Sequence, residues 1–195
     1  FSKAISLNPS NADLYVRRAR VLTKDKRHEA ALQDLLLASD FNALNYRIPY
    51  YTGKVYADLA QYGNAISQFT RAIELREGYN EAYAARAEAR LGLGDVVEAR
   101  KDYDIAVENT NYRPERMLVK RAAFFYSQQQ YEEAMVDYRL AREKNPRHAV
   151  AWLGETRAAM KLDDPISALY AINEYLKLKP KSEEALAIQS KLAGG

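Results

Sequence analysis

Alanine recurs along this chain at an almost constant spacing. The five alanines are Ala31, Ala65, Ala99, Ala134 and Ala168. They are separated by 34, 34, 35 and 34 residues. A period of about 20–50 residues is typical of stacked repeats, in which each repeat buries its apolar surface against its neighbours. The period therefore predicts a solenoid that has no single central core.

Four further positions follow the same period. Small residues lie twelve positions before each alanine, at Ala19, Gly53, Ala87, Ala122 and Thr156. Bulky residues lie sixteen positions before it, at Tyr15, Tyr83, Leu118 and Trp152, with Pro49 as the exception. Apolar residues lie four positions after it (Leu35, Phe69, Tyr103, Tyr138, Ile172) and seven after it (Ala38, Ala72, Ala106, Ala141, Tyr175). Spacings of three, four and seven residues share one helix face, so each repeat is predicted to be two closely packed antiparallel helices.

This pattern resembles the tetratricopeptide repeat, a helix–turn–helix unit of about 34 residues. Pro9, Pro146 and Pro180 lie where that family has its closing proline, and residues 91–95 (LGLGD) resemble its central turn. The resemblance covers nearly the whole chain. It implies an all-α fold, a right-handed α-solenoid of stacked antiparallel helix pairs.

The register of the repeats predicts one domain at residues 1–195. It divides the domain into a half repeat at 1–10, complete repeats at 12–45, 46–79, 80–114, 115–148 and 149–182, and a capping helix at 182–193. Departures from the family pattern at Pro49, Glu77 and Asn111 predict irregular structure near residues 42–49 and 110–115. Because the chain begins in mid-repeat at Phe1, without an initiator methionine, we expect it to be a fragment of a longer protein.

Composition excludes several classes of protein. The chain has no cysteine, which rules out disulfides and thiolate chemistry. No run of about 18 apolar residues is present, so no membrane insertion is expected. The net charge of +3 is too small to indicate a partner until the charges are placed.

Arginine and aspartate recur together in three of the repeats. The pairs are Arg18 with Asp34, Arg86 with Asp102, and Arg121 with Asp137, each sixteen residues apart. The other two repeats lack both members, with Thr52 and Gln68 in one and Glu155 and Ala171 in the other. Guanidinium and carboxylate groups can form two parallel hydrogen bonds, so we expect each pair to bridge the two helices of its repeat. Ligand binding by these arginines is the alternative.

The resemblance also implies a binding surface, since in that family the first helix of each repeat lines a concave groove. The corresponding positions hold nine basic and four acidic residues, while the rest of the chain has a net charge of −2. Ala84, Ala85 and Gly92 are expected to leave room in the middle of the groove. The residues expected to contact a partner are Arg17, Arg20, Tyr50, Tyr51, Lys54, Arg116, Lys120, Tyr126 and Arg157. The alternative is a solvated helix face whose charges serve solubility.

These observations predict a protein–protein interaction scaffold that binds another protein or a peptide, expected to be acidic, in a basic groove containing tyrosines. The alternative is a self-assembling module that forms homo-oligomers through its open ends, because Phe1, Ile5 and Leu7 lack a partner helix. Nucleic-acid binding is not expected, since the repeat fits the tetratricopeptide pattern better than that of base-reading helical repeats.

No catalytic or cofactor-binding motif is present. Phosphate-binding glycine loops and nucleophile elbows are absent from the sequence. The only histidines, His28 and His148, lack the spacing of metal ligands and are expected to be exposed, whereas Trp152 is expected in the core. We therefore predict neither enzymatic activity, nor a cofactor, nor a metal.

Overall fold

The chain is entirely helical in the part that the structure, a computed structural model, describes (residues 1–110 and 112–194). Twelve helices and no strand occur among these residues, which confirms the expected all-α solenoid of paired helices. Asn111, where the sequence departs from the family pattern, lies outside the described residues. The helices are α1 (Ser2–Leu7), α2 (Ala12–Lys24), α3 (His28–Phe41), α4 (Arg47–Asp58), α5 (Tyr62–Leu75), α6 (Asn80–Gly92), α7 (Val96–Glu108), α8 (Pro114–Ser127), α9 (Tyr131–Lys144), α10 (Ala149–Lys161), α11 (Pro165–Leu178) and α12 (Glu183–Ala193).

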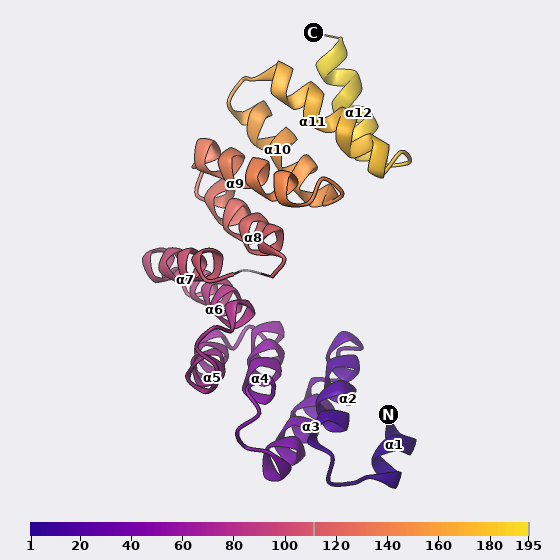
Figure 1. The fold of residues 1–195 in the computed structure, drawn as a ribbon, viewed down its shortest axis with the longest axis vertical. Coiled ribbons are helices and arrows are strands. Elements are labelled where there is room, and N and C mark those ends of the chain that lie inside the picture. Colours follow the sequence, from indigo (N-terminus) through magenta and orange to yellow (C-terminus); the bar gives the residue numbers. More distant parts are fainter. Residues whose placement is uncertain (111, 195) are drawn as a thin grey trace. The chain divides into compact units, whose positions relative to one another are not determined.

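Two compact units make up the chain, Phe1–Ala106 and Val107–Gly195. In the first unit α2 packs against α3, and α4 packs against α5, while α4 also contacts α2 and α6 (Figure 1). In the second unit α8 packs against α9, and α10 against α11, while α10 also contacts α8 and α9 (Figure 1). Helix α12 packs against α11. Within each unit the first helices of successive pairs are thus neighbours.

The periodic residues form the contact between the two helices of each pair. All five alanines that define the period are completely buried, and the large residue four positions later is buried in every repeat. Tyr15 and Trp152 are buried too, and each donates a hydrogen bond of 2.8 Å to the carbonyl oxygen of the preceding closing proline, Pro9 or Pro146. The expected core position of Trp152 is confirmed. The hydrogen bond lets these amphipathic side chains be buried without leaving a polar atom unsatisfied.

The turn inside each helix pair has one residue in the left-handed region. These residues are Lys26, Ala60, Gly94, Gln129 and Asp163, and they repeat with the period of the chain. A left-handed residue ends a helix and reverses the chain, and only Gly94 adopts this conformation without steric cost. Arg113, directly before the first residue of α8, is also left-handed (φ 54°), which agrees with the irregularity expected near residues 110–115.

Candidate protein-binding surface

Ion pairs fix the first helix of a repeat to the second. Arg86 on α6 donates two hydrogen bonds to Asp102 on α7, with N–O distances of 2.9 and 2.8 Å. Arg18 and Asp34 form the same paired contact at 2.7 and 2.6 Å, and Arg121 and Asp137 form it at 2.8 and 2.9 Å. The three aspartates are buried. The predicted bridges are therefore confirmed, and these arginines are structural.

Two of these arginines, Arg18 and Arg86, also reach back to the preceding repeat. Arg86 donates a hydrogen bond of 3.0 Å to the hydroxyl of Thr70, sixteen residues earlier, and Arg18 donates one of 3.2 Å to Ser2. In both cases the arginine thus contacts one side chain sixteen residues before it and another sixteen residues after it. We call such a set of three side chains a junction, and it connects three consecutive helices.

The fifth repeat has a junction of reversed charge that the sequence analysis missed. Glu155 stands where three of the other repeats have arginine, and only 1% of this residue is exposed. It accepts hydrogen bonds from Arg139 at 2.8 Å and from Arg142 at 2.6 Å, both on the preceding helix α9. The signal was the acidic residue at the arginine position, with an arginine sixteen residues before it rather than an aspartate after it.

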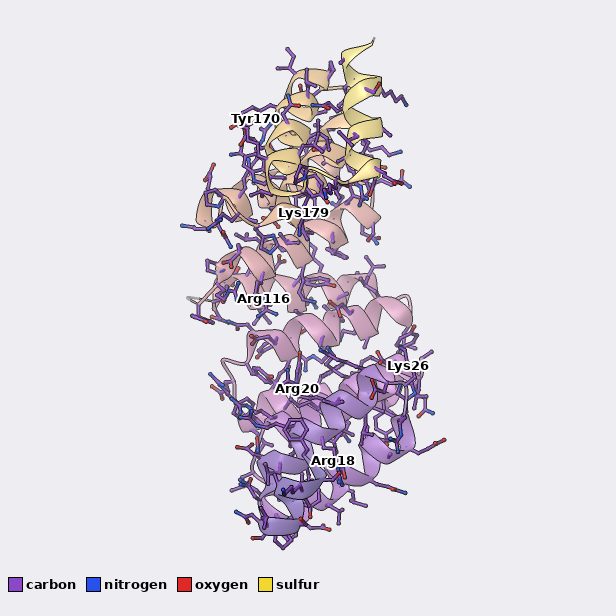
Figure 2. All side chains as sticks on the ribbon, turned by 90° about the vertical axis from the view of Figure 1, so that its right-hand side faces the viewer. Arg18, Arg20, Lys26, Arg116, Tyr170 and Lys179 are labelled. Carbon is purple, nitrogen blue, oxygen red and sulfur yellow. The ribbon has the colours of Figure 1, made fainter. Side chains whose placement is uncertain are left out.

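On the first unit, the predicted partner-contacting residues of α2 and α4 lie close together. The guanidinium of Arg20, which Figure 2 labels on α2, stands 5.0 Å from the centre of the Tyr51 ring on α4, so this contact connects the two helices. Arg17 and Lys54 are exposed, and neither has an acidic partner or a hydrogen bond among the described residues. This surface therefore offers cations that no side chain of the described protein neutralises.

Next to it lies a cluster of tyrosines that the sequence analysis identified only in part. The ring of Tyr50 packs against Tyr51 at 5.1 Å and against Tyr79 at 4.9 Å, and Tyr79 packs edge-on against Tyr46 at 4.8 Å. Arg76 donates a hydrogen bond to the Tyr46 hydroxyl. Burial raises the pKa of the Tyr79 hydroxyl above its ordinary value. Tyr46, Arg76 and Tyr79 lie just outside the regular helices or at their ends, where the repeat pattern gives no signal.

The predicted residues of the second unit are more strongly engaged with their own unit. Arg116 is exposed on α8, but Tyr126 packs against Tyr131 with ring centres 5.2 Å apart. Arg157 forms an ion pair with Glu184 of α12, and the hydrogen bond that it donates to this carboxylate raises the pKa of Arg157. Lys120 is half-buried on α8. The acidic side chain of the last helix therefore offsets part of the basic character that the sequence predicts here.

Two expectations from the sequence are wrong, one about the small residues of this surface and one about the histidines. Ala84 has no exposed surface at all, and the place that a Cβ atom would take at Gly92 lies 2.6 Å from the Tyr62 ring. Ala84 therefore cannot contact a partner, and the Tyr62 ring fills the space beside Gly92. The histidines are not exposed either, since both are half-buried and His28 lies 3.7 Å from Asp58.

The described residues contain no group of three or more His, Asp or Glu side chains that could hold a metal ion. No helix in this part of the chain combines the length and the apolar character that a membrane span requires.

Comparison with known proteins shows which repeat family and which proteins this chain is similar to. Two models of the tetratricopeptide repeat match the chain, one over residues 1–33 and the other over residues 52–114. Human mitochondrial import receptor subunit TOM70 is 27% identical over 142 residues, which cover 71% of this chain and 23% of the receptor. The chain spans 13% to 34% of the length of the six curated relatives that it matches.

Solved structures agree with this fold. Yeast Tom70 superposes with a TM-score of 0.84 at 21% identity, covering 100% of this chain and 42% of that one. YrrB, described as a TPR protein with an unusual peptide-binding site, superposes with a TM-score of 0.65 at 20% identity, covering 97% of both chains. At these levels of identity the likeness concerns the fold.

Proposed function

We propose that this chain, which belongs to the tetratricopeptide-repeat family, holds an acidic segment of another protein against the first helices of its repeats. Repeat arrays of this family are protein–protein interaction scaffolds, and that general role applies to this chain. The specific part of the proposal is the chemistry of the bound segment and the residues that contact it. They are Arg17, Arg20, Tyr50, Tyr51 and Lys54 on the first unit, and Arg116, Lys120, Tyr126 and Arg157 on the second.

One observation supports this proposal above all others: exposed cations on neighbouring helices lack acidic partners. Arg17 and Lys24 on α2 and Lys54 on α4 have no ion pair among the described residues. Elsewhere in this unit, basic side chains such as Arg18, Arg86 and Arg90 are paired. Several unpaired cations on one surface attract a carboxylate-rich segment, raise its association rate and make binding sensitive to salt.

The aromatic side chains add a contact that does not depend on charge. Arg20 lies against Tyr51, which holds both side chains in place before a partner arrives. Such prior ordering lowers the entropy cost of binding, and Tyr and Arg are the residue types enriched where binding energy concentrates. The similarity in fold to YrrB, a TPR protein with an unusual peptide-binding site, favours a peptide as the bound segment.

The experiment compares two charge-reversed variants of equal net charge. Lys54→Glu with Lys120→Glu changes the proposed surface, whereas Arg27→Glu with Arg147→Glu changes exposed residues in turns between helices. The probe is a fluorescein-labelled disordered peptide of alternating Glu and Ala, followed by anisotropy at low and at physiological ionic strength. We expect the first variant to bind about tenfold more weakly and the control to bind within about twofold of the original chain.

Equal binding by the original chain and the Lys54, Lys120 variant would overturn the assignment of the surface. Absence of binding at low ionic strength would overturn the proposal that the bound segment is acidic. Sedimentation of the original chain over a range of concentrations tests the alternative, since end-to-end assembly raises the average mass and is unaffected by the charge reversals.

A further inference from the structure

The second repeat has no charged residue at its junction. Where the third repeat brings together Thr70, Arg86 and Asp102, the second brings Leu36, Thr52 and Gln68, at the same spacing of sixteen residues. The Thr52 hydroxyl donates a hydrogen bond of 3.0 Å to the carbonyl oxygen of Ile48, within its own helix. The side-chain amide of Gln68 has no hydrogen-bond partner among the described residues. No side chain therefore spans the junction from one helix to the next.

A cleft lies at this junction. It has a volume of about 480 Å³ and is lined by residues of α3, α4 and α5, Thr52 and Gln68 among them. We call it the α3–α5 cleft. Its walls are mainly apolar, formed by leucines of α3 and α5 and by Ile48, Pro49 and Tyr56 of α4. A concave, largely apolar site with a few polar groups is typical of a binding site.

Exposed apolar side chains belong to the lining of the cleft or adjoin the lining residues in sequence. Leu36 is 67% exposed, the adjacent Leu37 is 42% exposed, and Leu44, which follows the lining residue Ala43, is 75% exposed. In the other repeats the position of Leu36 holds Thr70, Asp104, Arg139 and Asn173. Leucine at this position therefore makes the exposed surface of α3, in the first complete repeat, apolar where the other repeats are polar, and exposed apolar patches mark interaction sites.

The lining contains one charged side chain, the cation Arg71. Its ion pair with Glu74 at 3.1 Å joins two side chains that are both more than half exposed. Such exposed pairs are weak, so Arg71 can exchange Glu74 for a carboxylate of another molecule.

We propose that the α3–α5 cleft binds an amphipathic helix of a partner protein, which inserts a leucine-sized side chain into the cleft and presents a carboxylate to Arg71. Leu37 and Leu44 are exposed and directly follow the lining residues Leu36 and Ala43, and apolar residues spread over this length of chain fit a helix better than a small molecule. An apolar stripe with carboxylates beside it complements leucines that are flanked by one cation. Neither Arg20 nor Lys54 lines the cleft, and on α4 Lys54 is two positions from the lining residues Thr52 and Tyr56, which places it on another face of the helix. The role of the cleft is therefore independent of the acidic segment proposed above.

The test fills the cleft with the ion pair of the third repeat. Thr52→Arg combined with Gln68→Asp introduces the residues found at Arg86 and Asp102. The probe is a fluorescein-labelled model helix with leucines spaced three and four residues apart and glutamates beside them, and binding is measured by anisotropy. We expect the filled variant to bind about tenfold more weakly than the original chain, with unchanged helical circular dichroism. Leu36→Thr, which copies Thr70, is a second variant for which we expect the same direction of change.

Two controls separate this inference from the proposed function. Lys54→Glu should leave binding of the model helix within about twofold while it weakens binding of the disordered acidic peptide, and the filled variant should do the reverse. A model helix with lysine in place of glutamate should bind more weakly to the original chain, and this difference should disappear in Arg71→Ala.

Equal affinity of the original chain and the filled variant for the model helix would overturn the proposal, as would absence of binding to both. Binding of a medium-chain fatty acid in place of the helix, with loss in the filled variant, would also overturn it, because the cleft would then be a small-molecule site.

Discussion

The second and third repeats have the same pair of helices, but different interactions hold the pairs together. Between α6 and α7 the buried Asp102 accepts hydrogen bonds from Arg86 and Arg90, and Arg86 also bonds to Thr70. Between α4 and α5 the corresponding residues, Thr52 and Gln68, form no such contact, and a cleft lies beside them. Both pairs nevertheless keep the same arrangement of buried small and large residues. The comparison indicates that apolar packing specifies the helix pair, while the junction determines whether its outer side is closed.

The largest expected effect comes from removing the carboxylate of the third repeat. Asp102→Ala leaves two partly buried guanidinium groups without their carboxylate, and we expect a loss of about 3 kcal/mol in the free energy of unfolding. Gln68→Ala removes no interhelical hydrogen bond and should cost less than about 0.5 kcal/mol. Urea unfolding followed by circular dichroism measures both. Similar losses in the two variants would show that the junction contributes nothing specific.

A smaller effect is expected when the cation is removed. Arg86→Ala should cost about 2 kcal/mol, because Arg90 still pairs with Asp102. Thr52→Ala should cost at most about 0.5 kcal/mol, since its hydroxyl bonds only within α4. A double-mutant cycle on Arg86 and Asp102 should give a coupling of more than about 1 kcal/mol. A coupling near zero would mean that the paired geometry adds no stability.

The fold and the three Arg–Asp bridges could be predicted because they depend on spacing alone. A period of 34 residues fixes which side chains face each other, and the joint presence or absence of arginine and aspartate predicted the bridges. The junction at Glu155 was missed because its charges are reversed and its partners precede it. The α3–α5 cleft was missed for a different reason. The sequence shows that Thr52 and Gln68 lack charges, but the free volume depends on how far the neighbouring side chains reach.

The candidate surface could be predicted less well than the fold. The pattern correctly placed Arg20 and Tyr51 together, because both lie on helices whose register is fixed. It did not predict that the Tyr62 ring fills the space beside Gly92. Tyr62 lies at the start of α5 and Gly92 lies in the next repeat, and the pattern within one repeat does not specify such contacts between repeats. The ion pair of Arg157 with Glu184 was also missed, because α12 lies outside the repeats that were compared.

The free energy of unfolding of the filled variant also tests the comparison between the second and third repeats. Thr52→Arg combined with Gln68→Asp should raise the free energy of unfolding by about 1 kcal/mol, the net value of a hydrogen-bonded pair in a partly buried site. Each single substitution places one charge beside apolar walls without its partner and should be neutral or destabilising. Thermal unfolding of the two single variants and the double variant tests this coupling. If the double variant equals the sum of the singles, the introduced pair has not formed.

The smallest expected effect concerns the turns of the same two repeats. Ala60 between α4 and α5 and Gly94 between α6 and α7 are both left-handed, with φ of 55° and 80°. A Cβ atom strains this conformation, and at Gly94 it would meet no other atom within 4 Å, so the effect is purely conformational. Ala60→Gly should therefore stabilise the chain by about 0.5 kcal/mol, and Gly94→Ala should destabilise it by a similar amount.

The control is Gly63→Ala within α5, where an added Cβ also meets no atom, and this change should not destabilise the chain. If Gly94→Ala and Gly63→Ala shift the melting temperature in the same direction, the strain that a Cβ atom causes in a left-handed turn does not account for a difference in stability between the two repeats.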